Sequence, residues 1–176
     1  MTFRQQIAKY VTGNMTTDQL PNLVGTSGLE EGLDSPSLCI LAGLSKNESP
    51  HQIEFYFKQT LQELNIELPN RRQAAIDYAL GIVDDILLGK KDVILGTKEM
   101  CHNALDSYDF ISETKKYVYD SISFETVYGL FVTHEELIQA DRLWQTEKTN
   151  EQLMVETKTD LFEELKKWKN KMVSGT

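Results

Sequence analysis

Apolar side chains recur at three- and four-residue steps along most of the chain, which is the period of an amphipathic helix. The stretch 71–88 shows the period most clearly and predicts a long helix, with seven inward-facing positions: Ala75, Ile76, Ala79, Ile82, Val83, Ile86 and Leu87. The same spacing predicts further helices over 2–11, from about 17 to a stop at Gly32, and over 36–43, 50–64, 93–106, 133–144 and 150–172.

Capping residues mark several of the expected helix ends. Ser35-Pro36 and Ser49-Pro50 each combine a favoured N-cap with a proline at the first helical position, and Asn70 and Asp92 are further N-cap candidates. Gly43 and Gly89 follow the last periodic residues, where glycine commonly ends a helix. The run 133–136, Thr-His-Glu-Glu, reads as a capping box that opens another helix.

Aromatic and β-branched residues are frequent between 107 and 130, and the segment 117–131 is compatible with a short strand or an irregular loop. The pattern otherwise predicts an all-α fold: one domain over residues 1–176, built from about seven or eight helices. A chain of 176 residues is long enough to bury a core without disulfides or metals. Two small subdomains are the less favoured organisation.

Cysteine use and hydropathy suggest a cytoplasmic protein. Cys39 and Cys101 lie within apolar helical patterns, which favours free thiols that pack as small hydrophobes. Charged and polar residues interrupt the first ten positions where a signal peptide would be apolar, and no apolar run approaches the length of a membrane span. A single disulfide or a reactive thiol is the alternative for the cysteines.

The net charge is −9, from 27 acidic and 18 basic residues, which argues against nucleic acid as a partner because Lys and Arg supply most of that affinity. Residues 101–147 hold nine acidic and three basic residues, so this stretch alone carries −6. A basic protein partner fits such a balance.

The motifs of common active sites are missing from the sequence. His51, His102 and His134 lack metal-ligand spacing, and the glycines near 25–32 do not form a phosphate loop. The adjacent Asp84 and Asp85 diverge on a helix and are typical of a solvated face. We therefore expect neither an enzyme nor a bound cofactor or metal.

Tyrosines alternate with acids between 106 and 144, a composition typical of protein-binding surfaces. The residues predicted to contact a basic partner are Asp106, Asp109, Glu113, Asp120, Glu125, Glu135, Glu136 and Asp141. The competing interpretation places the aromatic side chains in the core and leaves the acids as ordinary solvated residues.

One block has a distinctive sequence, LEEGLDSPSLCILAGL over 29–44, followed by an F…L.ELNIELPN segment over 57–70 and by a helix that ends IVDDILLGKKD over 82–92. It resembles a family of small, acidic, helical bacterial proteins with a GxDSPxLxxLAGL signature, which are similar to the immunity proteins of polymorphic or contact-delivered toxin systems. The resemblance covers about residues 20–92 and implies no catalytic residue.

The sequence thus predicts a protein-binding module, an immunity-type inhibitor that binds and occludes a basic toxin domain. The alternative is a structural or regulatory helical scaffold without a toxin partner, homodimeric through the apolar stripe of the 150–172 helix. The oligomeric state stays open.

Overall fold

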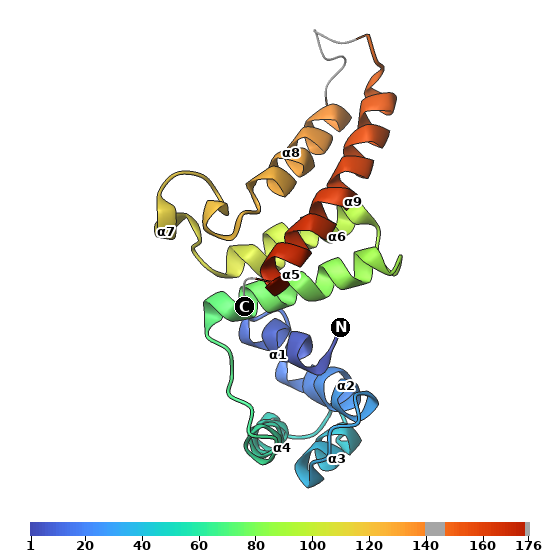
Figure 1. Ribbon diagram of the computed structural model, residues 1–176. Helices are drawn as coiled ribbons and strands as arrows, with labels where there is room; N and C mark the ends of the chain where they lie inside the picture. Colours follow the sequence, from blue (N-terminus) through green and yellow to red (C-terminus); the bar gives the residue numbers. More distant parts are fainter. Residues whose placement is uncertain (140–146, 175–176) are drawn as a thin grey trace. The chain divides into compact units, whose positions relative to one another are not determined.

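A computed structural model describes residues 1–139 and 147–174, and these residues confirm the all-α class (Figure 1). Helices account for all the regular secondary structure in those two ranges, and no strand occurs there. The α-helices are α1 (Phe3–Val11), α2 (Thr26–Glu30), α3 (Pro36–Gly43), α4 (Pro50–Glu63), α5 (Arg71–Leu87), α6 (Val93–Glu99), α7 (Ile111–Thr114), α8 (Glu125–Gln139) and α9 (Asn150–Ser174). Short turns of 3₁₀- or π-helix connect them: η1 (Thr17–Gln19), η2 (Pro21–Gly25), η3 (Met100–Ala104), η4 (Leu105–Ser107) and η5 (Asp120–Ile122).

The chain divides into two compact units, which are described separately. Unit 1 comprises Met1–Gly81 and Asp106–Tyr108, and unit 2 comprises Ile82–Leu105 and Asp109–Thr176. The boundary falls within α5, so one continuous helix supplies residues to both units. The expectation of one domain over the whole chain stays a prediction.

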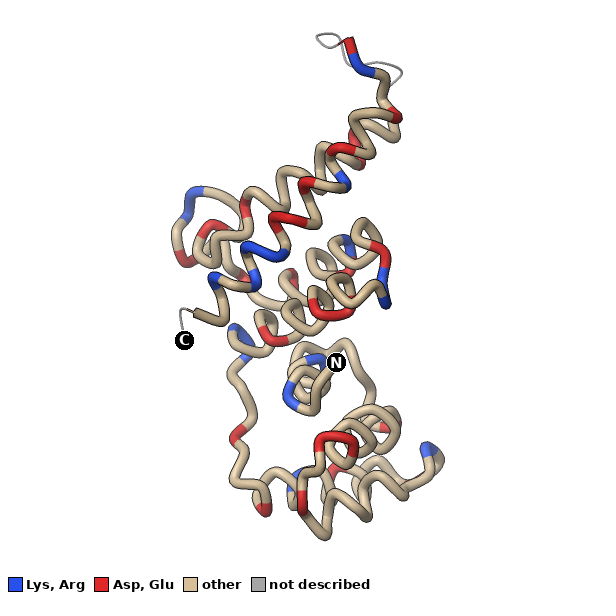
Figure 2. The backbone as a smooth tube through the Cα atoms, turned by 45° about the vertical axis from the view of Figure 1, so that its right-hand side comes forward, with Lys and Arg blue, Asp and Glu red and all other residues tan. Residues whose placement is uncertain are grey.

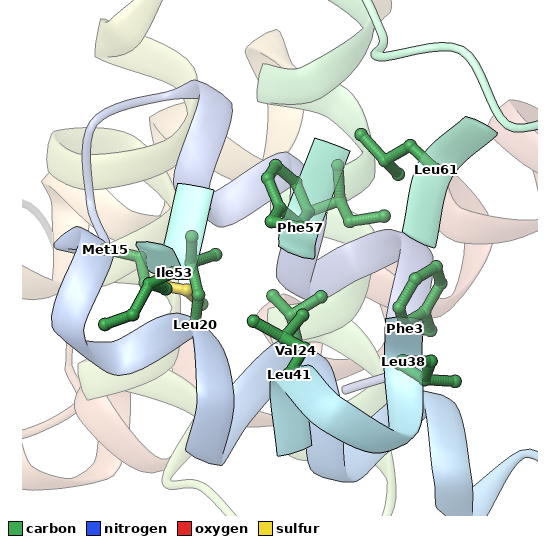
Figure 3. Close-up of a cluster of buried hydrophobic side chains, with 10 residues drawn as sticks. Phe3, Met15, Leu20, Val24, Leu38, Leu41, Ile53, Phe57 and Leu61 are labelled. Carbon is green, nitrogen blue, oxygen red and sulfur yellow. The ribbon is translucent and has the colours of Figure 1, made fainter. Parts of the chain in front are cut away.

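Unit 1 is built around an apolar cluster from α1, η2, α3 and α4 (Figure 3). Ten buried side chains form it: Phe3, Ile7, Met15, Leu20, Val24, Leu38, Leu41, Ile53, Phe57 and Leu61. Tyr10 packs edge-to-face on Phe57 at a centroid distance of 5.4 Å. Helix α4 buries the stripe that the sequence period predicts, since Ile53, Phe57 and Leu61 follow one another at four-residue steps.

Hydrogen bonds at the start of α3 connect two segments of the sequence, 29–44 and 57–70. The Ser35 side chain accepts a hydrogen bond from the Leu38 N–H at 3.1 Å, as predicted for an N-cap. Glu63, from the end of α4, accepts bonds from the Ser35 hydroxyl, from the Ser37 hydroxyl at 2.6 Å and from the Ser37 N–H at 3.0 Å. These bonds hold the pKa of the Glu63 carboxyl below its usual value. The Ser-Pro-Ser sequence at 35–37 therefore caps the start of α3, and the Glu63 carboxylate accepts further hydrogen bonds from the same residues.

Unit 2 is organised around the antiparallel helices α8 and α9. The Asn150 side chain, at the start of α9, donates to the Leu137 carbonyl near the end of α8 at 3.2 Å. At the other end, the Trp168 Nε1–H donates to the Ile122 carbonyl at 2.9 Å, just before α8 begins. Leu161, Leu165 and Trp168 are buried between these two anchor points.

The structure decides between the alternatives for 117–131 and corrects the predicted start of the next helix. Of the two alternatives, the strand does not form: irregular turns with a 3₁₀ turn at Asp120–Ile122 lead to α8, which supplies the rest of the segment. Helix α8 begins at Glu125, eight residues before the predicted capping box, and the Thr133 hydroxyl donates to the Gly129 carbonyl inside the helix. The predicted helix start at the capping box was wrong because one buried face runs through the whole of α8, from Val127 and Phe131 to His134 and Leu137.

Both cysteines are free, as expected, but only one of them packs in the core. Cys101 is buried, whereas Cys39 is exposed on the outer side of α3, so its assignment as a packed residue was wrong. None of the helices in the described part of the chain combines the length and apolar character needed to cross a membrane.

Candidate protein-interaction surface

The aromatic residues of the 106–144 stretch mostly belong to the core. Tyr119 is buried and packs edge-to-face on Phe110, Phe124 and Tyr128, at centroid distances of 6.3, 5.7 and 5.4 Å. Tyr117 is 70% exposed, Tyr108 and Tyr128 are half-buried, and Trp144 lies outside the described residues. The core interpretation therefore holds for Tyr119 and for the phenylalanines of the stretch, whereas the other three tyrosines keep exposed surface.

The backbone around these aromatic residues is strained. Lys115, Tyr119 and Ser123 have φ values of 58°, 63° and 54°, in the left-handed region that non-glycine residues rarely adopt. Burial of the Tyr119 ring among its aromatic neighbours offsets this cost. The turns bring the chain from α7 back to the start of α8 and leave Ile111 and Tyr117 exposed.

The predicted acidic residues do not all fall in one unit. Asp106 belongs to unit 1, Asp141 lies outside the described residues, and the other six belong to unit 2. Asp109 accepts a hydrogen bond from the Ser112 N–H at 3.2 Å and so caps the start of α7. Within unit 2, Asp109, Glu113, Glu125 and Glu136 are exposed, and Asp120 and Glu135 are half-buried.

The net charge of the chain can be divided between the two units. Unit 1 holds ten acidic and six basic residues, and unit 2 holds seventeen and twelve, so their net charges are −4 and −5. Figure 2 shows acidic positions distributed along most of the described helices. The other residues of unit 2 hold nine acidic and nine basic residues, so its whole net charge of −5 comes from the stretch 109–147.

Helix α8 carries acidic residues without a basic residue of its own. Its fifteen residues include Glu125, Glu135 and Glu136 and neither lysine nor arginine. Glu125 and Glu136 are eleven residues apart, about three turns, so they lie on one side of the helix and about 16 Å from each other. The opposite side is buried through Val127, Phe131 and Leu137. We call the exposed side, from Glu125 to Glu136, the acidic face of α8.

Acidic and apolar residues meet where α8 ends and α9 begins. Ile138 and Val155 are 58% and 67% exposed, although apolar side chains of this size are usually covered. Glu135 pairs with Lys98 at 3.8 Å, and Glu156 pairs with Lys148 at 2.6 Å. The hydrogen bond between Asn150 and Leu137 places the end of α8 and the start of α9 at the same end of the helix pair. We call this end the α8–α9 tip; it comprises Glu135, Glu136, Ile138, Glu151, Val155 and Glu156.

Sequence reasoning found Glu135 and Glu136 at this tip and missed Val155, Glu151 and Glu156. The missed residues lie beyond the predicted acidic stretch, on a helix whose charges balance at five acidic and five basic residues. Only the antiparallel packing of α9 on α8 brings the start of α9 to the end of α8, where Asn150 donates to the Leu137 carbonyl. No local sequence signal could have grouped them.

The apolar stripe of α9 is already used inside unit 2. Leu161 and Leu165 have no exposed surface, and Trp168 is 3% exposed. A homodimer through these side chains would require them to leave their own core. The stripe therefore does not support the scaffold alternative.

The histidines and the adjacent aspartates belong to no metal-binding group in the part of the chain that the structure describes. His51 and His102 are exposed and His134 is buried on α8, and no metal-binding group of His, Cys, Asp and Glu occurs among the described residues. Asp84 forms an ion pair with Lys169. This ion pair connects α5 with the C-terminal part of α9 within unit 2.

Comparison of the chain with protein-family models, with curated proteins and with solved structures gave no match.

Proposed function

We propose that this chain is a cytoplasmic, immunity-type protein that binds a basic toxin domain and occludes its active site. The observation that carries the proposal is the acidic face of α8, which ends at the exposed apolar residues of the α8–α9 tip. Carboxylates attract and orient a basic partner, and exposed apolar side chains supply the area that is dehydrated on binding.

The dimensions of this surface suit a protein partner. A stable complex buries roughly 800 Å² on each side. The acidic face spans about 16 Å, so one interface of that size can cover both of its ends and the tip. Glu125, Glu136 and Glu151 form no ion pair with another described residue, which leaves them available to a partner's lysines and arginines.

The first experiment uses the chain as bait in an extract of the cells that produce it, at low salt and at about 1 M salt, where the Debye length falls to about 3 Å. The expected result is one basic protein that is retained at low salt and released at high salt. The captured protein is then purified, and its toxic activity is titrated with the chain. Inhibition that is complete at equimolar chain supports the proposal, and retained activity in the complex contradicts occlusion.

A charge-reversal pair of variants then tests the surface. Glu125→Lys/Glu136→Lys/Glu151→Lys alters α8 and the tip, and the control Asp18→Lys/Glu30→Lys/Glu48→Lys alters three exposed acids of unit 1 by the same total charge. We expect the first variant to bind the partner about tenfold or more weakly at low salt, since each reversed pair costs up to about 1 kcal/mol. Equal weakening in both variants would show that net charge, and not this surface, determines binding.

A further inference from the structure

Unit 1 contains a pocket of about 370 Å³ that the proposed function does not use. Residues of α1, of the irregular segment 66–70 and of α5 line it. An adjoining pocket of about 430 Å³ shares three of its residues, Arg4, Gln73 and Asp77. Pockets that bind small molecules typically have volumes of roughly 300–1,000 Å³, so the first pocket alone is large enough for a small metabolite.

Asp77 is the half-buried carboxyl group of this pocket. Its Oδ1 accepts a hydrogen bond from the Gln73 Nε2–H at 2.7 Å. Burial raises the pKa of the Asp77 carboxyl, while the bond from Gln73 and the positive charge of Arg4 partly oppose that rise. The other carboxylate oxygen, Oδ2, accepts no hydrogen bond from the described residues, and the Asp77 residue remains partly exposed. A donor placed in the pocket would therefore compensate a carboxylate that has lost part of its hydration.

Arg4 supplies the opposite charge at the same pocket. Its charge acts on Asp77, but the described residues contain no direct ion pair between the two. The side chain of Arg4 is exposed on α1, one turn before the buried Ile7. A cation and an anion thus line one pocket without neutralising each other by contact.

The rest of the lining is mixed, with the polar residues Glu67, Asn70 and Gln73 beside four apolar ones. Ile7, Ile66, Leu68 and Pro69 line the pocket, and Leu68 is 48% exposed. Ile66 is held in place because its N–H donates to the Leu61 carbonyl at 2.8 Å. The pocket combines the positive Arg4, the half-buried Asp77 carboxyl, a second carboxylate on the exposed Glu67, and apolar side chains that a ligand's side chain could cover.

We propose that this pocket binds a zwitterionic α-amino acid with an apolar side chain. The ligand carboxylate pairs with the Arg4 guanidinium, the ammonium group donates to Asp77, and the side chain covers Leu68 and Ile66. A simple amine would be repelled by Arg4, and a simple carboxylic acid would be repelled by Asp77. Only a ligand with both charges satisfies both groups. This site lies in unit 1, and its ligand is independent of the partner proposed for α8.

Isothermal titration calorimetry of the whole chain with three probes tests the assignment. The probes are L-leucine, L-leucine amide, which lacks the carboxylate, and N-acetyl-L-leucine, which lacks the ammonium group. We expect L-leucine to bind and each derivative to bind about tenfold or more weakly, as a lost charge-assisted hydrogen bond implies. Failure of L-leucine to bind at millimolar concentration, or equal binding of all three probes, overturns the proposal.

Two variants assign the charges to their residues. Asp77→Asn should remove the preference for L-leucine over N-acetyl-L-leucine, and Arg4→Gln should remove the preference over the amide. The matched controls are Asp18→Asn and Lys58→Gln, which remove the same charges at exposed positions outside the pocket. Circular dichroism and thermal unfolding show whether each variant is folded. Variants that are folded but keep the wild-type ranking of the probes would also overturn the assignment.

Discussion

Gly25 offers a sharp test of how unit 1 is packed. Its φ of −57° and ψ of −51° are ordinary helical values, so backbone conformation does not require glycine there. The requirement comes from proximity. A Cβ at this position would lie 2.7 Å from the Ala42 Cα and 2.9 Å from the Ala42 N–H nitrogen, both backbone atoms of α3. Ordinary van der Waals contact begins at 3.4 Å.

The magnitude for Gly25→Ala follows from two opposing effects. Alanine is favoured over glycine in a helix by about 1 kcal/mol. Against this gain, η2 and α3 must separate, because the obstructing atoms belong to the backbone and cannot rotate away. Overpacking of a core costs about 1–3 kcal/mol, and more where the backbone itself must move. We expect a net loss of about 1–2 kcal/mol in the free energy of unfolding.

Gly129→Ala is the matched control, since Gly129 lies inside α8 and an added Cβ would meet nothing within 4 Å. It should stabilise the protein by about 0.5–1 kcal/mol. Urea unfolding followed by far-UV circular dichroism measures both variants. With a slope of about 1–3 kcal/mol/M, their midpoints should differ by about 1 M. A midpoint for Gly25→Ala at or above that of the wild type would refute the close approach of η2 to α3.

Three further predictions concern single polar groups. Because hydrogen bonds lower the pKa of Glu63 below 4.5, its ionised form stabilises the fold above that pH, and the stabilisation is lost as pH falls through the lowered value. Acidification should thus move the urea midpoint of Glu63→Gln less than that of the wild type, and an equal change would contradict the cap on α3. Burial raises the pKa of Asp77 above 3.8, so ionising this carboxyl destabilises the fold, and the cost is fully present once pH exceeds the raised value. Asp77→Asn should therefore unfold at a higher urea concentration than the wild type at neutral pH. A lower midpoint would contradict this prediction. Trp168→Phe removes the donor of the 2.9 Å bond to the Ile122 carbonyl and should cost about 1–3 kcal/mol by the same assay, whereas an unchanged midpoint would exclude that bond.

Local chemistry explains why several helix ends could be predicted. Ser35 caps α3, and Asp92 accepts bonds from the Ile94 and Leu95 N–H groups at 2.9 and 3.2 Å to cap α6. Gly32 and Gly89 adopt φ values of 73° and 69° where helices stop. Each of these signals involves residues within a few positions of one another, so it is legible without knowledge of the fold.

Tertiary packing accounts for the two failed predictions. The residues 133–136 have the composition of a capping box, but a cap requires the preceding residue to leave the helix. Burial of Val127 and Phe131 holds the preceding residues in α8 instead. Similarly, the apolar neighbours of Cys39 predicted a packed thiol, yet α3 presents that side to solvent. In both cases the decision depends on which face another helix covers.

The candidate surface shows the same division. The acids of α8 were identified from the sequence, whereas Val155 and Glu151 joined them only through the docking of α9. The count of −6 over 101–147 becomes −5 in unit 2 because Asp106 belongs to unit 1, and the rest of unit 2 adds equal numbers of acidic and basic residues.

The sequence by itself determined that this chain is helical and where many of its helices begin and end, because those outcomes depend on hydrogen bonds and periodicity within a few residues. Tertiary structure decided which tyrosines are core, why Gly25 must be glycine, and that Arg4 and Asp77 line one pocket. Those outcomes depend on contacts between residues far apart in the chain, and a periodic pattern shows that a face is buried without showing what covers it.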